Sequence, residues 1–212
     1  MFPITVAPCR DARVGFSVSA AFGGVNAAIV FGPVRGGGED DRPSSRREVA
    51  AIATARVATD DLPLARVFPG APPTLGRADA YVRGGIAALA AVRNIAADVA
   101  PGVFGPDTAV VLASASNCHA ADLRYHAGLV DGGPAQASRL HFSYTVPGAP
   151  AAEASILLGL RAPVLVYCAD GACAEDEARR LVAEGVVPSA VALRIESPGS
   201  FADAEAILLA PP

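Results

Sequence analysis

Hydrophobic and polar residues near the start of the chain alternate in a way that predicts a β-hairpin. Val14, Phe16 and Val18 alternate with small residues, which indicates a strand with one buried face. A glycine turn at 22–24 and a short apolar run at 27–31 complete the hairpin. Two adjacent glycines permit positive φ and leave their amide N–H groups unobstructed, so this turn is also a candidate oxyanion donor.

Strands and helices are predicted to alternate along the rest of the chain. Short apolar runs predict strands at residues 48–59, 107–113, 140–146, 164–168, 190–195 and 204–209. Apolar residues at helical spacing predict helices at 77–99, 118–129, 151–160 and 172–184. Because short turns separate these elements, the pattern predicts an α/β sandwich with a mixed, mostly parallel sheet flanked by helices.

A stretch rich in glycine, proline, serine and charge separates the hairpin from these elements. It lacks apolar periodicity, which is typical of a flexible linker. We therefore divide the chain into a hairpin at 1–33, a linker at 34–46 and a larger segment at 47–212. The hairpin and the larger segment are expected to form one globular unit overall.

Composition excludes several classes of function. The chain has 212 residues, of which 52% are hydrophobic and 18% charged, so a substantial core is expected. All 17 basic residues are arginine, which excludes a Schiff-base lysine and the lysine of a phosphate-binding loop. A net charge of −4 and the lack of tryptophan give no reason to expect nucleic acid.

The remaining composition concerns membranes and thiols. We expect no signal peptide and no membrane span, because no suitable long apolar run is present. The spacing of Cys9, Cys118, Cys168 and Cys173 fits neither a zinc site nor a disulfide framework. These cysteines therefore indicate reduced thiols in a cytoplasmic protein.

Several segments resemble β-ketoacyl synthases, which are condensing enzymes of the thiolase fold. Residues 19–27 are similar to their Ser-Phe-Gly-Phe-Gly-Gly-Thr-Asn-Ala turn. Residues 142–163 are similar to their Phe-x-x-Thr-Val-Pro motif and the Leu-Gly-Leu-x-Gly-Pro motif that follows it. The segments 47–59, 77–98, 107–114, 190–196 and 201–212 resemble further elements of the N-terminal half, in the same order. The resemblance implies a truncated and rearranged half-thiolase, in which the C-terminal hairpin comes first.

The resemblance also implies where catalytic residues are expected. The family uses a cysteine nucleophile at the start of a helix, where the helix dipole lowers its pKa. Counting from Pro163 places Gly171 at this position, whereas counting back from Gly185 favours Cys168. Cys173 is a further candidate, although neighbouring carboxylates would oppose formation of its thiolate. Small buried apolar side chains are the simpler explanation of both cysteines.

Histidines are the other requirement of the family, and its two histidine motifs are missing here. His141 is the candidate base that we select, and His119 is a second. His119, Asp122 and His126 lie at helical spacing, which fits either a metal-binding stripe or a half-exposed helix face. No fourth ligand is recognisable, so we predict neither a metal nor a cofactor. Adjacent residues diverge on a helix, so a dyad of Cys118 and His119 is not expected.

Two functions follow from the resemblance. The first is a non-catalytic accessory subunit, similar to a chain-length factor, in type II fatty acid or polyketide biosynthesis. Half of a thiolase sheet is expected to leave an apolar face and a strand edge uncovered, which predicts a homodimer or a heterodimer with a complete ketosynthase. An acyl carrier protein is a further expected partner.

The alternative function is an active β-ketoacyl synthase or acyltransferase that acts on acyl carrier protein or coenzyme A thioesters. Cys168 or Cys173 would then be acylated, and the Phe22 N–H would stabilise the oxyanion. In either case the expected substrate-binding residues are those of the glycine turn: Phe22, Gly23, Gly24 and Asn26.

Overall fold

Two compact units make up the chain, residues 1–44 and residues 45–212. The computed structural model describes residues 15–20, 26–31, 46–59, 75, 78–198 and 201–212. The predicted turn at 22–24 lies outside the described residues, as does the predicted linker apart from its last residue. The division into the segments 1–33, 34–46 and 47–212 stays a prediction.

The described part of the first unit is an antiparallel hairpin. Strand β1 (Gly15–Ala20) pairs with β2 (Asn26–Phe31) in a register that joins Gly15 to Phe31 and Ala20 to Asn26. Both strands were expected from the alternating pattern and the apolar run, and both are confirmed.

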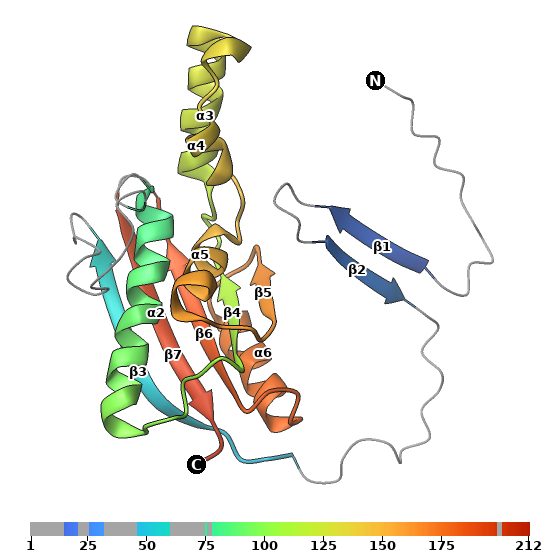
Figure 1. Cartoon of the computed structure of the whole chain (residues 1–212), viewed down its shortest axis with the longest axis vertical. Coiled ribbons are helices and arrows are strands. Elements are labelled where there is room, and N and C mark those ends of the chain that lie inside the picture. The colour runs from blue at the N-terminus through green and yellow to red at the C-terminus, as the bar shows by residue number, and fades with distance from the viewer. Residues whose placement is uncertain (1–14, 21–25, 32–45, 60–74, 76–77, 199–200) are drawn as a thin grey trace. The chain divides into compact units, whose positions relative to one another are not determined.

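A mixed five-stranded sheet forms the centre of the second unit (Figure 1). Its strands, in spatial order, are β3 (Ala50–Thr59), β7 (Ala202–Ala210), β6 (Ser189–Glu196), β4 (Thr108–Ala113) and β5 (Val164–Tyr167). Strand β4 is parallel to β5 and β6, whereas β7 is antiparallel to β6 and β3. Four of the five strands therefore run in one direction, which confirms a mixed, mostly parallel sheet.

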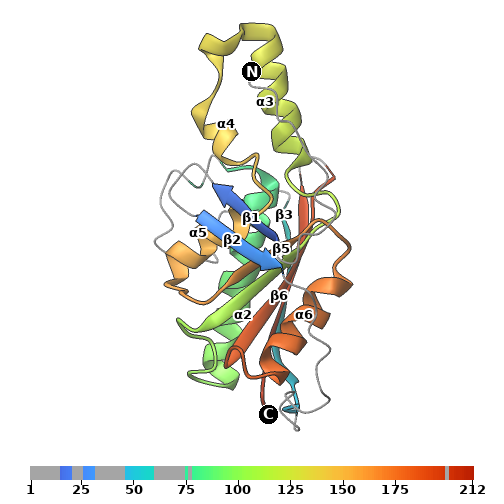
Figure 2. The same ribbon diagram turned by 90° about the vertical axis from the view of Figure 1, so that its right-hand side faces the viewer.

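Helices cover both faces of this sheet. The helical elements are α2 (Ala80–Val99), α3 (His119–Gly132), the 3₁₀ turn η2 (Pro134–Gln136), α4 (Arg139–Ser143), α5 (Ala149–Leu158) and α6 (Ala172–Ala183). Helix α2 and helix α5 lie on one face and α6 lies on the other (Figure 2). In the part of the chain that the structure describes, no helix is long and apolar enough to cross a membrane.

The strand predicted at 140–146 is wrong, because this segment forms α4 and the turn that follows it. Ser138 accepts a hydrogen bond from His141 N at 3.2 Å, so it caps the helix. Thr145 Oγ1 donates to Phe142 O at 2.7 Å, and Tyr125 and Phe142 form a ring contact at 5.4 Å. These local bonds and the packing on α3 outweigh the short alternating pattern.

The α2 face of the sheet holds most of the apolar core. Alternate residues of β6, such as Leu193 and Ile195, are fully buried on this side together with Leu208 of β7. Small residues in α2 allow the helix to lie close to its neighbours. At Gly85, an added Cβ would lie 2.6 Å from both Ile195 Cδ1 and Pro150 Cβ.

The opposite face is apolar under α6 and charged beyond it. Ala190 and Ala192 pack against α6. Farther along the strands, Arg56, Glu205 and Arg194 stand opposite one another on β3, β7 and β6. Arg56 also forms an exposed ion pair with Asp203. Among the described residues, this end of the face is therefore polar, and the uncovered apolar face expected from the sequence does not lie there.

Candidate functional site

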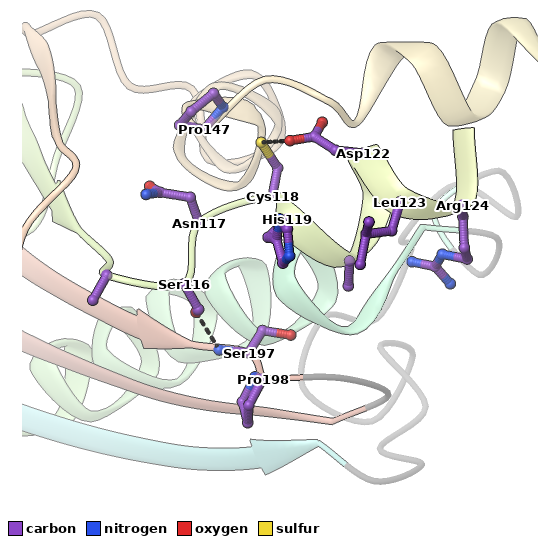
Figure 3. A pocket seen from close by; sticks show the side chains of 12 residues that line it. Ser116, Asn117, Cys118, His119, Asp122, Leu123, Arg124, Pro147, Ser197 and Pro198 are labelled. Carbon is purple, nitrogen blue, oxygen red and sulfur yellow. Dashed lines mark hydrogen bonds between the residues drawn. The ribbon is translucent and has the colours of Figure 1, made fainter. Parts of the chain in front are cut away.

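A cavity of about 790 Å³ opens where β4 leads into α3 (Figure 3). The parallel strands β4 and β6 both end beside it, and ligands of α/β sheets often bind at the carboxyl ends of parallel strands. The lining residues are Ala115, Ser116, Asn117, Cys118, His119, Ala120, Asp122, Leu123, Arg124, Pro147, Ser197 and Pro198. Because most of the exposed surface of the lining is apolar, the cavity suits an apolar ligand that carries a few polar groups.

Hydrogen bonds from the end of β6 hold one wall of this cavity. The Glu196 carboxylate accepts from the backbone N–H groups of Ala115 and Ser116, each at 3.2 Å. Ser197 N donates to Ser116 Oγ at 2.7 Å. Asn117 has a φ of 47°, a left-handed conformation that asparagine tolerates better than most residues. The β4–α3 loop is therefore fixed in place before any ligand binds.

Cys118 lies at the end of this loop and lines the cavity. Its side chain is buried, and Sγ donates to Asp122 Oδ2 at 3.7 Å. Burial, and then the charge of Asp122, raise the pKa of the Cys118 thiol to about 11. The thiol is thus protonated near neutral pH, and it is a weak nucleophile in this setting.

The histidines of α3 do not form a metal site. His119 lines the cavity, and His119, Asp122 and His126 are all exposed. Among the described residues, no group of three or more histidine, cysteine, aspartate or glutamate side chains is placed to hold a metal ion. Although His119 lines the same cavity as Cys118, the thiol donates its hydrogen bond to Asp122.

His141, the candidate base, lies in a different place. It lines a small cavity of about 20 Å³ together with Asp79, Ala121, Arg124 and Tyr144. Asp79 Oδ1 caps α2 by accepting from Val82 N at 3.0 Å, and Asp79 Oδ2 lies 3.4 Å from Arg124 Nη2. In the described part of the chain, neither this small cavity nor the larger one beside Cys118 is lined by Cys168 or Cys173.

The candidate thiols lie around the start of α6. Cys168 directly follows β5 and is exposed, so it is not the small buried side chain that was the simpler expectation. Cys173 is half-buried in the first turn of α6, and its Sγ donates to Asp170 O at 3.1 Å. Burial, and then the charge of Asp170, raise the pKa of Cys173.

Gly171, the position given by counting from Pro163, carries no nucleophile and lies close to Arg194. The side chain of Arg194 lies over it, so that an added Cβ would collide with Arg194 Cδ and lie 2.6 Å from Cγ. The register of β6 against β4 places Arg194 opposite Ala113. Arg194 of β6, which pairs with β4 and not with β5, thus lies over this position, and its side chain would have to shift to admit a side chain here.

The glycine-turn candidates cannot be placed in either cavity. Phe22, Gly23 and Gly24 lie outside the described residues. Asn26 begins β2 in the first unit. Their role in substrate binding stays a prediction.

Sequence reasoning missed several residues that shape the cavities, among them Asp79, Arg124, Glu196 and Ser197. Asp79 carries a detectable signal, because an acidic residue just before an apolar helical pattern is a typical cap. The role of Glu196 has no such signal, since it depends on the pairing of β6 beside β4.

Comparisons with known proteins identify the fold. No family model matches the chain, and no curated protein matches it. One similar solved structure is a complex of a type II polyketide synthase acyl carrier protein with its ketosynthase, at a TM-score of 0.61 and 12% identity. The match covers 79% of this chain and 58% of that one.

Two further structures contain chain length factors. The ishigamide ketosynthase/chain length factor has a TM-score of 0.56 and 13% identity, over 72% of this chain and 48% of that one. A ketosynthase in complex with its chain length factor from Xenorhabdus doucetiae has a TM-score of 0.54 and 14% identity, over 72% and 62%. The chain therefore spans about half to three fifths of the length of these proteins. Together with the mixed sheet between helices, these similarities show that the chain has the thiolase-like fold of ketosynthases and chain length factors.

Proposed function

We propose that the chain is a non-catalytic accessory subunit that associates with a complete ketosynthase in type II fatty acid or polyketide biosynthesis. The fold is that of proteins solved as ketosynthase–chain length factor complexes, which supports this role. Because a similar structure contains an acyl carrier protein, such a carrier is a second expected partner.

The observation that carries the proposal is the start of α6. A condensing enzyme needs a thiolate there, and Gly171 instead lies under the side chain of Arg194. Of the neighbouring thiols, Cys173 has a raised pKa, which disfavours its thiolate at neutral pH. These features favour a subunit that does not form an acyl-enzyme.

A surface suited to a partner lies around β5, α5 and the turn after α4. Strand β5 is at the edge of the sheet and pairs with β4 on one side. Val146, Ile156 and Val166 are exposed here, with Ile156 at 78%. Among the described residues this strand edge has no second partner, and an unpaired edge beside exposed apolar side chains favours association with another chain. We assign this surface to the ketosynthase.

The 790 Å³ cavity is assigned to an acyl chain. Leu123, Pro147 and Pro198 supply apolar wall, and Ser116 and Asn117 supply polar groups. In a complex, a ligand of the ketosynthase would extend into this space, and the fixed β4–α3 loop would limit its length.

The test uses the full chain mixed with a type II ketosynthase and its acyl carrier protein, followed by native mass spectrometry. A complex with the ketosynthase is expected. Val166→Glu and Ile156→Glu are each expected to weaken it at least about tenfold, as for apolar residues at the centre of an interface. Thr54→Glu is the matched control, because it adds the same charge at an exposed position of β3, the opposite edge strand.

A second measurement separates the proposed role from the active enzyme. The chain alone is incubated with acyl thioesters and its intact mass is recorded. We expect no stable acyl adduct, and an adduct that disappears in the Cys168→Ala, Cys173→Ala double variant would instead establish the acyltransferase. A chain that stays monomeric at micromolar concentration and binds neither ketosynthase nor carrier would contradict the accessory role.

A further inference from the structure

The carboxylate of Asp79 has one oxygen without a hydrogen-bond partner. Its side chain is only 6% exposed, and Oδ1 is used to cap α2. Oδ2 is buried and accepts no hydrogen bond in the structure, and it lies 3.4 Å from Arg124 Nη2. The charge of Arg124 lies close to this oxygen but does not supply a hydrogen bond, so a hydrogen-bond donor at this point is favoured.

The small cavity beside Asp79 has the size and polarity for one donor. Its volume of about 20 Å³ exceeds the roughly 10–15 Å³ that a single water needs. Arg124, His141 and Tyr144, whose side chains all carry polar groups, join Asp79 and Ala121 in its wall, and a buried water needs two to four polar partners. The guanidinium of Arg124 disfavours a metal cation in the same space, since like charges repel at short distance.

We propose that Asp79, Arg124, His141 and Tyr144 form a binding site for one structural water molecule. The water donates one hydrogen bond to Asp79 Oδ2 and bonds with its remaining capacity to groups of α4 and the turn after it. It thereby connects the start of α2 to the connection between β4 and β5. No proton is transferred in this role.

The site also affects the larger cavity, because Arg124 lines both. Helix α3 buries only Ala121 among its own residues, so the contacts at its base carry much of its attachment. A water that satisfies Asp79 next to Arg124 fixes the guanidinium at the wall of the larger cavity. This function does not depend on whether the chain associates with a ketosynthase.

A crystal structure of the full chain, grown without ammonium, gives the direct test. One ordered water is expected about 2.5–3.0 Å from Asp79 Oδ2 and within hydrogen-bond reach of at least one more of the four side chains. A dry cavity would overturn the proposal, as would density with metal-like coordination or a rearrangement in which a side chain bonds to Oδ2 itself.

A double-mutant cycle tests the same site in solution. Asp79→Asn keeps a capping side chain and removes the charge, and Tyr144→Phe removes only the hydroxyl. Each is expected to lower the folding equilibrium constant about fivefold, as for the loss of one hydrogen bond. If both bind one water, the double variant loses clearly less than the product of the single effects.

Tyr167→Phe is the matched control, because Tyr167 packs in the cluster on the α6 face of the sheet. The fold-changes that Tyr167→Phe and Asp79→Asn cause in the folding equilibrium constant are expected to multiply in the double variant, as for independent sites. Independent effects for Asp79→Asn and Tyr144→Phe as well would overturn the water bridge. If Asp79→Asn does not fold, Arg124→Gln takes its place in the cycle.

Discussion

Helices α2 and α3 differ in what stabilises them. Twelve residues of α2 are buried, between the sheet and α5, whereas α3 buries Ala121 alone. Figure 1 shows α3 and α4 extending beyond the end of the sheet. Tertiary packing therefore stabilises α2, and α3 depends on its own helix propensity and on its contacts with α4. A helix of the second kind is free to serve as a surface rather than as core.

The N-terminal ends of α2 and α3 also differ, because only α2 is capped by a side chain. Asp79 caps α2 through a bond from Val82 N, but Cys118 makes no capping bond at the start of α3. The base of α3 is nevertheless partly anchored, since Cys118 and Ala121 are each less than 5% exposed. The contrast is thus between α2 and the outer part of α3.

The largest test compares one leucine of each helix. Leu89 of α2 is 0% exposed, and Leu123 of α3 is 57% exposed. Leu89→Ala is expected to lower the free energy of unfolding by about 2–5 kcal/mol, because it opens a cavity in the core. Leu123→Ala is expected to change it by less than about 0.5 kcal/mol. Urea unfolding measures both, and equal losses would contradict the distinction between core and surface helix.

The reactivity of the Cys118 thiol tests whether the start of α3 is buried, in contrast to the exposed outer part of the helix. Because the pKa of Cys118 is about 11, roughly one molecule in a thousand carries its thiolate at pH 8. We expect iodoacetamide to modify Cys118 at least about 100-fold more slowly than the exposed Cys168. Peptide mapping after timed labelling gives both rates.

The pH dependence of Cys118 has a defined sign. Its folded pKa lies above the ordinary value, so the folded state favours the neutral thiol. The resulting stabilisation is complete below the unfolded pKa of about 8.5 and is lost as the pH rises towards 11. Cys118→Ala should remove this loss of stability at alkaline pH.

In the labelling experiment, modification of Cys118 as fast as that of Cys168 at pH 8 would show that the cavity wall opens.

Sequence patterns predicted most of the elements but not their neighbours. The helical spacing of 77–99 identified α2 within three residues, and the apolar runs identified the five strands. The segment at 140–146 failed because alternation over seven residues also fits a capped turn of helix packed on α3. An alternating hydrophobic pattern indicates that one side of a segment is buried, but it does not indicate which element packs against that side.

The candidate site shows the same limit. A short turn was expected between the strand at 107–113 and the helix at 118–129, and the structure has a loop there. Its bonds to Glu196 join residues about eighty positions apart, and the position of Arg194 over Gly171 depends on β6 pairing beside β4. Such contacts follow from the order of strands in the sheet, which no single segment encodes.

The smallest test makes one substitution in each helix and expects opposite signs. Gly85→Ala places a methyl group 2.6 Å from Ile195 Cδ1 and from Pro150 Cβ, and the proline ring has little freedom to move. The overpacking is expected to cost about 1–3 kcal/mol in spite of better helix propensity. Gly128 of α3 has nothing within 4 Å of an added Cβ, so Gly128→Ala is expected to stabilise by about 0.5–1 kcal/mol.

Opposite signs would isolate packing as the difference between the helices, because the change in helix propensity is the same at both positions. A loss of stability at Gly128 would mean that the outer part of α3 already packs against another chain in solution. Thermal unfolding at several protein concentrations distinguishes that case, since a contact between chains makes the midpoint depend on concentration. A gain at Gly128 that is independent of concentration leaves the outer part of α3 as an open surface of the isolated chain.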